Sequence, residues 1–181
     1  MISDTNQVSD RETPITIVVN DATLLIDLFE IGLIKEFFEL PLEFHTTQLI
    51  LNELEPNQIQ ILKVFIDSRK LKVRHLTIAE VESLNTLSEN YNAFTREDLS
   101  IYLYVKELPK CIILTGDNRL KLEARKRGLE VFEVIWVLEQ MVENRLLDKN
   151  KALETLRKLV KLKFGFTSKD EYRKALEKWS K

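Results

Sequence analysis

Short apolar runs alternate with longer segments of helical periodicity from about residue 15 to the end of the chain. Short runs rich in Val, Ile and Leu are typical of strands that lie buried in a sheet. They predict strands at Ile15–Val19, Leu42–His45, Leu71–Leu76, Cys111–Leu114 and Glu130–Val134. Helices are predicted between and after them, at Ala22–Phe29, at Leu33–Leu40, from a cap at Thr46 or Thr47 to about Leu54, from Pro56, from a cap at Thr77 to Leu87, at Leu99–Leu108, at Asn118–Arg127 and from about Ile135 onward.

This order of elements indicates the fold class. Strands interleaved with helices imply right-handed crossovers and a mostly parallel sheet. We therefore expect an α/β protein, a three-layer α/β/α sandwich with a mostly parallel central sheet. A chain of 181 residues, 44% of them apolar, can bury one substantial core. We expect a flexible polar leader over 1–13, a domain over 14–146 and a C-terminal helical extension over 147–181 that packs on the domain.

Composition limits the partners and the compartment. The formal net charge is −2, so the chain lacks the overall positive charge of a typical nucleic-acid binder, and any phosphate-binding surface must be local. One such candidate is the basic run from Lys121 to Arg127. The single cysteine, Cys111, excludes an intramolecular disulfide and a cysteine zinc site and fits the cytoplasm. The leader does not resemble a signal peptide, and no apolar run approaches the roughly 20 residues that span a membrane.

Four acidic residues lie where predicted strands end or predicted helices begin. They are Asp21 in VVNDATLLIDL, Glu53 in LILNELE, Asp98 in TREDLSIYLYVKE and Asp117 in IILTGDNRL. Because the carboxyl ends of neighbouring parallel strands line one crevice, these side chains can converge. Converging carboxylates repel one another unless a cation neutralises them, and an oxygen-only set suits Mg²⁺ or Mn²⁺.

The same segments, with IILTGDNRLKLEARKRGL, resemble a PIN domain of the VapC-toxin-like kind over roughly residues 15–135. The helical tail, with LKFGFTSKDEYRKALEK, resembles the C-terminal extension of one PIN subgroup. PIN domains are three-layer α/β/α folds that act as metal-dependent ribonucleases. The resemblance therefore implies an endoribonuclease, either a toxin held by an antitoxin protein or, as the alternative, a weak or inactive interaction module.

The resemblance also implies roles for the acids. Asp21 and Asp117 match direct ligands of Mg²⁺ or Mn²⁺, Asp98 matches a third ligand or an acceptor beside the ion, and Glu53 matches a helix-borne glutamate that orients or deprotonates water. Thr115 resembles the hydroxyl that supports the site. Glu97 could take the place of Asp98, and Asn118 stands where a second acid often follows Asp117, which puts a second metal site in doubt.

Each acid also has a structural interpretation. Asp21 and Asp117 could cap the helices that follow them, since aspartate is a favoured N-cap residue. Asp98 could form a capping box with Thr95, and Glu53 could be an ordinary solvated helix residue.

Other phosphate-handling α/β proteins fit less well. A phosphoacceptor receiver domain needs an acidic pair at the first strand, where Asn20-Asp21 supplies one acid. A dehalogenase-like phosphatase needs Asp-x-Asp, where Asp21 is followed by Ala22 and Thr23.

A homodimer is expected from the crowding of apolar side chains in the first two helices. A contiguous excess of such residues is typical of a protein interface, and PIN-like toxins commonly pair. The residues concerned are Leu24, Leu25, Leu28, Phe29, Ile34, Phe37 and Phe38.

Overall fold

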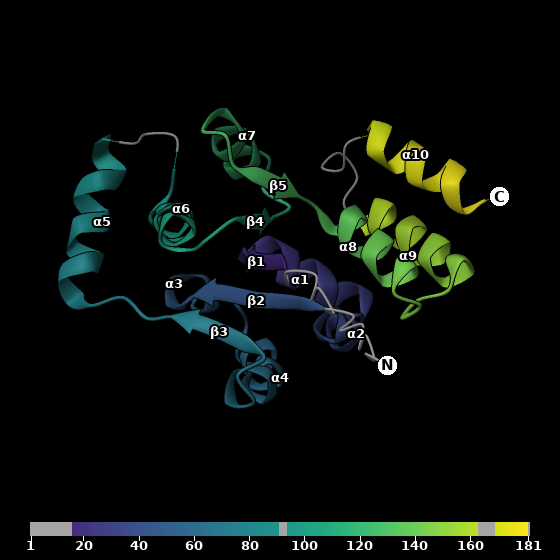
Figure 1. The fold of residues 1–181 in the computed structure, drawn as a ribbon, viewed down its shortest axis with the longest axis horizontal. Coiled ribbons are helices and arrows are strands. Elements are labelled where there is room, and N and C mark those ends of the chain that lie inside the picture. The colour runs from purple at the N-terminus through teal and green to yellow at the C-terminus, as the bar shows by residue number, and fades with distance from the viewer. Residues whose placement is uncertain (1–15, 91–93, 163–168, 181) are drawn as a thin grey trace, which may run out of the picture.

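A five-stranded parallel sheet forms the centre of the molecule, with strand order β3-β2-β1-β4-β5 (Figure 1). The computed structural model of the protein describes residues 16–90, 94–162 and 169–180, so the leader predicted over 1–13 lies outside the described residues. The strands are β1 Thr16–Asn20, β2 Leu42–Thr47, β3 Leu71–Arg74, β4 Cys111–Leu114 and β5 Glu130–Phe132. Every pairing is parallel, as the alternation of strands and helices predicts.

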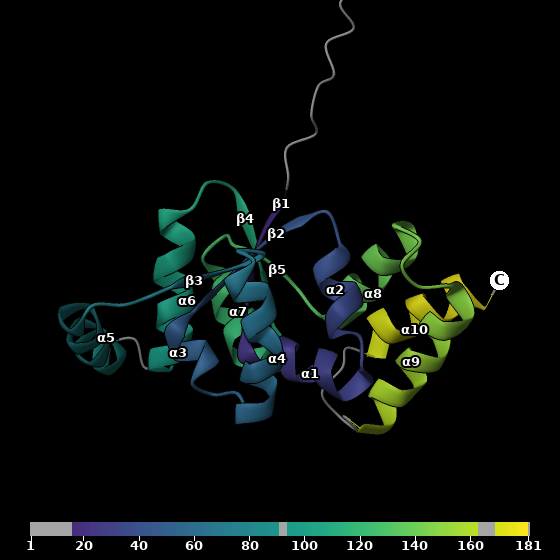
Figure 2. The ribbon, with the colours of Figure 1, turned by 90° about the horizontal axis from the view of Figure 1, so that it is seen from below.

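Helices surround this sheet and confirm the expected α/β/α architecture (Figures 1 and 2). Helix α5 lies at one end of the molecule, and α9 and α10 lie at the other in both views. Helix α9 contacts α1 and α8 as well as α10. Among the described helices, none has the length and apolar character to cross a membrane. The helices are α1 Ala22–Ile31, α2 Ile34–Glu39, α3 Gln48–Leu51, α4 Pro56–Asp67, α5 Ile78–Asn90, α6 Arg96–Glu107, α7 Asn118–Lys126, α8 Val134–Glu143, α9 Lys149–Leu162 and α10 Lys169–Trp179.

Local signals in the sequence place several helix ends. Gly32 ends α1 with φ 75°, a left-handed conformation that glycine adopts without a steric penalty. Pro56 occupies the first turn of α4, where its missing N–H costs nothing. Thr77 and Glu80 form reciprocal hydrogen bonds at the start of α5. These three boundaries are confirmed because each depends on neighbours in sequence alone.

Other predicted boundaries are wrong where tertiary contacts decide. Strand β2 continues to Thr47, two residues beyond the predicted end at His45, because Thr46 and Thr47 are buried and hydrogen-bonded. Helix α3 ends at Leu51, so Glu53 lies in the following turn and not on a helix. Helix α6 begins at Arg96, which brings Asp98 inside its first turn.

The apolar side chains of the first two helices fill the core of the single chain. Six of the seven residues on which the expected dimer rested are buried, and Phe29 is partly buried. Phe37 and Phe38 contact Phe44 of β2 in edge-to-face pairs, with ring centroids 4.8 and 4.9 Å away. The inference from these residues to an exposed interface is therefore wrong, and the homodimer stays a prediction.

The strand order creates a crevice between β1 and β4. From β1 the chain moves outward to β2 and β3 on one side, and it then crosses to β4 and β5 on the other. Loops that leave β1 and β4 at their carboxyl ends therefore diverge, and ligands of open α/β sheets bind in the opening between them. Asp21 follows β1 at this point, and Thr115 to Asp117 follow β4.

Candidate active site

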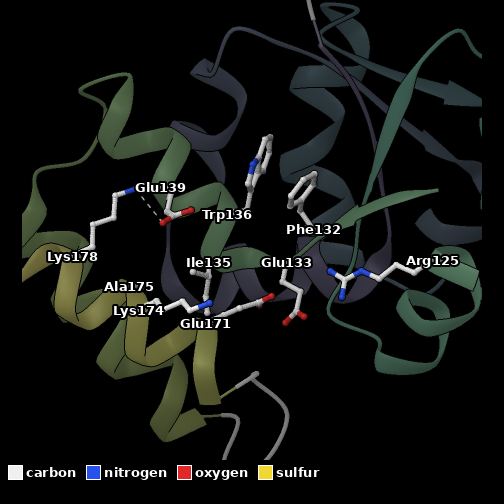
Figure 3. Close-up of a pocket in the computed structure, with 10 residues that line it drawn as sticks. All are labelled: Arg125, Phe132, Glu133, Ile135, Trp136, Glu139, Glu171, Lys174, Ala175 and Lys178. Carbon is white, nitrogen blue, oxygen red and sulfur yellow. Dashed lines mark hydrogen bonds and ion pairs between the residues drawn. The ribbon is translucent and has the colours of Figure 1, made fainter. Parts of the chain in front are cut away.

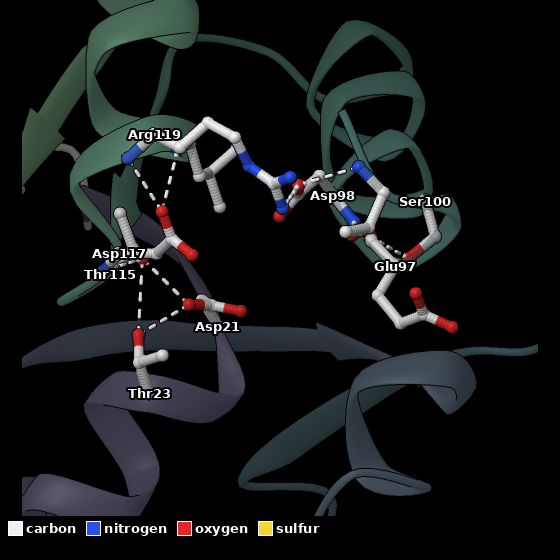
Figure 4. A network of polar contacts seen from close by, with 10 residues as sticks. Asp21, Thr23, Glu97, Asp98, Ser100, Thr115, Asp117 and Arg119 are labelled. Carbon is white, nitrogen blue, oxygen red and sulfur yellow. Dashed lines mark hydrogen bonds and ion pairs between the residues drawn. The ribbon is translucent and has the colours of Figure 1, made fainter. Parts of the chain in front are cut away.

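Asp21 is held at the end of β1 by two threonine hydroxyls (Figure 4). Its Oδ2 accepts hydrogen bonds from Thr23 Oγ1 at 2.5 Å and from Thr115 Oγ1 at 2.7 Å. Burial raises the pKa of Asp21 above its ordinary value, against hydrogen bonds from Thr23, Thr115 and the backbone of Ala22. The charge of Asp117 raises it further. The structure gives Asp21 no side-chain hydrogen bond that would cap α1.

The two threonines are themselves oriented by the backbone. Thr23 Oγ1 accepts from the Gly116 N–H at 2.8 Å, and Thr115 Oγ1 accepts from the Asp117 N–H at 2.9 Å. Each hydroxyl has a single proton, and both protons point at Asp21. The 3.2 Å contact between the two hydroxyl oxygens therefore reflects their shared acceptor. Fixed backbone groups thus determine the direction of the Asp21 carboxylate.

Asp117 serves as the N-cap of α7. Its Oδ1 accepts from the backbone N–H groups of Arg119 at 2.6 Å and Leu120 at 3.0 Å. The capping interpretation of Asp117 is therefore confirmed. Capping uses one carboxylate oxygen, and the charge of the group still reaches Asp21 and Glu53.

Asp98 occupies the first turn of α6 and is 8% exposed. It forms a capping box with Thr95: the Thr95 N–H donates to Asp98 Oδ2 at 2.8 Å, and the Asp98 N–H donates to Thr95 Oγ1 at 3.0 Å. The same Oδ2 accepts from Arg119 Nη2 at 3.0 Å. Burial raises the pKa of Asp98, although the contacts with Thr95 and the charge of Arg119 oppose this.

Glu53 is exposed and lies within the electrostatic influence of four other acids. Loss of hydration, followed by the charges of Asp21, Glu97, Asp98 and Asp117, raises the pKa of Glu53 to about 7. The four acids predicted from the sequence, together with Glu97, therefore share one electrostatic environment at the crevice.

These carboxylates are not gathered tightly. Within residues 16–90, 94–162 and 169–180, no three His, Cys, Asp or Glu side chains already stand in an arrangement that would hold a metal ion. The chemistry of the set nevertheless fits a hard divalent cation, because it offers carboxylate oxygens alone. Burial, and after it the charges of the neighbouring acids, raises the pKa of Glu53.

Sequence reasoning missed three residues of this site. Thr23 holds Asp21, Arg119 pairs with Asp98, and Asp27 is a buried acid one helical turn beyond Thr23. A Cβ added to Gly116 would lie 3.3 Å from Asp27 Oδ2 and 3.5 Å from Thr23 Oγ1, so glycine permits this close approach. The spacing of Thr23 and Asp27, four residues apart on one helix face, was the available signal.

Asn20, the residue before Asp21, joins β1 to β2. Its Nδ2 donates to the carbonyl oxygen of His45 at 3.0 Å, and its own carbonyl accepts from Thr46 Oγ1 at 2.9 Å. His45 is buried and its ring contacts Tyr104 and Glu43, as expected for a packed residue. These bonds fix the end of β1 from which Asp21 projects.

The basic run from Lys121 to Arg127, a candidate phosphate-binding surface, makes its contacts within the protein. Lys121 pairs with Glu133, and Arg125 donates to the carbonyl of Val131. Both remaining members of the run, Lys126 and Arg127, pair with Glu123. The cation that reaches the crevice from α7 is Arg119.

A separate cavity of about 270 Å³ lies between β5, α8 and α10 (Figure 3). Trp136 and Phe132 stack there with ring centroids 5.1 Å apart. Lys178 pairs with Glu139, so the lining mixes both signs of charge. None of the predicted site acids lines this cavity, and the candidate chemistry lies at the crevice.

Comparison with known proteins agrees with the fold. A family model described as a PIN domain matches residues 17–181, which include the three C-terminal helices. The chain belongs to the PIN-domain family. Members of this family are generally nucleases and typically use divalent metal ions. No protein with a curated description matches the chain.

Proposed function

We propose that this protein is a metal-dependent endoribonuclease that cleaves RNA phosphodiester bonds in the cytoplasm. The observation that carries the proposal is the placement of Asp21 and Asp117, which follow β1 and β4 at the switch point of the sheet, with Arg119 linking Asp117 to Asp98. Membership of the PIN-domain family supports it.

Asp21, Asp98 and Asp117 would hold Mg²⁺ or Mn²⁺. When bound, such an ion supplies an activated water and neutralises charge that develops on the phosphate. Thr115 and Thr23 keep the Asp21 carboxylate directed into the crevice. A carboxylate with a pKa near 7 can accept a proton from water at neutral pH and release it again, so Glu53 is suited to act as the general base.

One observation favours the alternative of a catalytically weak or inactive interaction module. Asp98 Oδ2 already accepts hydrogen bonds from Arg119 and Thr95, and no three metal-binding side chains among the described residues are in place. A protein that never bound an ion would keep this arrangement. The two functions differ in whether a divalent ion changes the protein.

Single-turnover cleavage of a structured RNA tests the proposal. The unmutated protein should cut the RNA in the presence of Mn²⁺ and stop in the presence of EDTA. Asp21→Asn is the matched control, because it keeps the shape of the side chain and removes the charge. Cleavage that persists unchanged in Asp21→Asn would identify a contaminating nuclease, and a complete lack of Mn²⁺-dependent cleavage would favour the interaction module.

The finer assignment is the toxin of a toxin–antitoxin pair that acts as a homodimer. A toxin of this kind should arrest growth when expressed in a bacterial host, and Asp21→Asn should grow normally at equal protein level. Light scattering at tens of micromolar tests the dimer, and a monomer mass would exclude it. Normal growth with the unmutated protein would exclude the toxin role and leave the nuclease proposal standing.

A further inference from the structure

Arg119 contacts two of the three acids to which we assign the ion. Its backbone N–H donates to Asp117 Oδ1 at 2.6 Å, and its guanidinium crosses to α6, where Nη2 donates to Asp98 Oδ2 at 3.0 Å (Figure 4). The Asp98 side chain is 8% exposed, whereas that of Arg119 is 49% exposed. The fixed partner is therefore the acid, and the arginine reaches it from solvent.

The pairing gives Asp98 a counter-ion in the absence of metal. A buried carboxylate is costly unless it is paired and hydrogen-bonded. Asp98 Oδ2 receives the Thr95 N–H and the Arg119 guanidinium, while no hydrogen bond to Oδ1 is present within the described residues. A divalent ion that binds Asp98 has to share this carboxylate with Arg119 or displace it, because two cations on one carboxylate repel each other.

The displaced guanidinium has a new partner when RNA is present. Arginine binds phosphate through parallel N–H···O bonds, and its long side chain lets it swing while its Cα stays on α7. An RNA backbone in the crevice between Asp117 and Asp98 would lie within its reach, since Arg119 spans these two residues. The other basic side chains of α7 are paired elsewhere.

We propose that Arg119 is the resident counter-ion of Asp98 and transfers to the RNA backbone when a divalent ion takes over that carboxylate. This inference rests on the proposed function and adds regulation to the same site. Arg119 opposes the ion when RNA is absent and favours RNA once the ion is bound. Ion and RNA binding are therefore coupled, and each raises the affinity for the other.

The test measures Mn²⁺ affinity with and without RNA. Free Mn²⁺ is measured by electron paramagnetic resonance. The RNA probe is a 20-nucleotide single strand of mixed sequence. Its products are separated on a gel, so that only uncut RNA is counted as ligand. In the unmutated protein, RNA should tighten Mn²⁺ binding about fivefold or more, the lower end of typical coupling between sites. In Arg119→Gln, Mn²⁺ should bind more tightly without RNA, and the gain from RNA should vanish.

Arg96→Gln is the matched control. Arg96 lies on the same helix end as Asp98 and pairs with Glu97 at 3.2 Å, so its loss removes one positive charge from the same neighbourhood. This variant should keep the coupling of the unmutated protein. Arg119→Lys retains the charge without the planar fork and should bind Mn²⁺ as the unmutated protein does, with weaker RNA affinity.

The outcomes separate this inference from the proposed function. If the unmutated protein binds no Mn²⁺, the proposed function fails and the inference falls with it. Suppose instead that the unmutated protein binds Mn²⁺ and cuts RNA. The inference alone is then wrong if Arg119→Gln binds Mn²⁺ no more tightly than the unmutated protein does, or if RNA still tightens Mn²⁺ binding in this variant to the full extent. Loss of coupling in Arg96→Gln and not in Arg119→Gln would transfer the role to Arg96 and Glu97.

Discussion

The two sides of the crevice hold their acids in different ways. The strand side consists of Asp21 and Asp117, which follow β1 and β4 and are tied to backbone N–H groups directly or through Thr23 and Thr115. The helix side consists of Asp98 on α6 with Glu53 in the turn after α3. Asp98 caps its own helix and pairs with a half-exposed arginine, and Glu53 is exposed.

This difference separates a fixed half-site from an adjustable one. The carboxylates of the strand side are oriented by backbone N–H groups and by the hydroxyls of Thr23 and Thr115. The helix side must exchange partners, because its buried carboxylate already has two donors. No set of three metal-binding side chains is preformed among the described residues. The following predictions separate the two sides.

The largest effect is expected from comparing Asp98→Asn with Thr95→Ala. If Asp98 binds the ion, Asp98→Asn should reduce single-turnover cleavage by about 100-fold or more, the scale for losing a group that stabilises transition-state charge. Thr95→Ala removes the cap and should cost about 1 kcal/mol of stability while cleavage continues below the melting temperature. If Asp98→Asn remains active, Asp98 only caps α6, and Glu97 becomes the candidate for the third acid that binds the ion.

Added Mn²⁺ should stabilise the folded protein, because the ion would bind carboxylates on both the strand side and the helix side of the crevice. Mn²⁺ that binds only the folded form at 100 times Kd contributes about 2.7 kcal/mol, read as a rise in melting temperature. Asp21→Asn should instead stabilise the metal-free protein, because it removes a buried charge, and should abolish the response to Mn²⁺. Equal melting curves with Mn²⁺ and with EDTA in the unmutated protein would remove the metal site.

Thr115→Val tests the fixed side without touching a carboxylate. The valine leaves the Asp117 N–H without its acceptor and Asp21 without one donor, at a cost of about 1–3 kcal/mol for groups left unsatisfied. Thr46→Val is the control, since Thr46 is equally buried and donates one hydrogen bond to the Asn20 carbonyl. Urea unfolding should rank Thr115→Val as the less stable variant, and the opposite order would show that the Thr115 network adds nothing.

The smallest effect concerns pH. Folding raises the pKa of Glu53 from its ordinary value of 4.5 to about 7, so the folded protein keeps a proton that the unfolded chain releases. This contribution to stability is complete below pH 4.5 and is lost as the pH rises through 7. In EDTA, Glu53→Gln should therefore lose less stability between pH 4.5 and 7 than the unmutated protein does. Identical slopes would place Glu53 outside the field of the other acids.

Features set by neighbouring residues were predictable from the sequence. The structure confirms the five predicted strands, the glycine that ends α1 and the capping box between Thr95 and Asp98. Each of these features depends on a few adjacent positions. The parallel sheet follows from the alternation of strands and helices, whereas the strand order that makes β1 and β4 neighbours comes from the structure.

Contacts between distant segments were not predictable in the same way. Thr115 contacts Thr23 and Asp21, which lie 92 and 94 positions away in sequence. Arg119 on α7 pairs with Asp98 on α6. Nothing in the local pattern distinguishes Arg119 from the other basic residues of α7. The apolar excess in the first two helices failed as a guide to an interface because α1 and α2 are buried on more sides than a single amphipathic stripe.

Crystals grown with Mn²⁺ test the central claim most directly, through an anomalous difference map recorded near the manganese absorption edge. We expect a peak at the carboxyl ends of β1 and β4, coordinated by Asp21 and Asp117, with Asp98 turned toward it and Arg119 released. A map that shows no peak between these residues at saturating Mn²⁺, while Arg119 still binds Asp98, would contradict the claim that this crevice is a metal site.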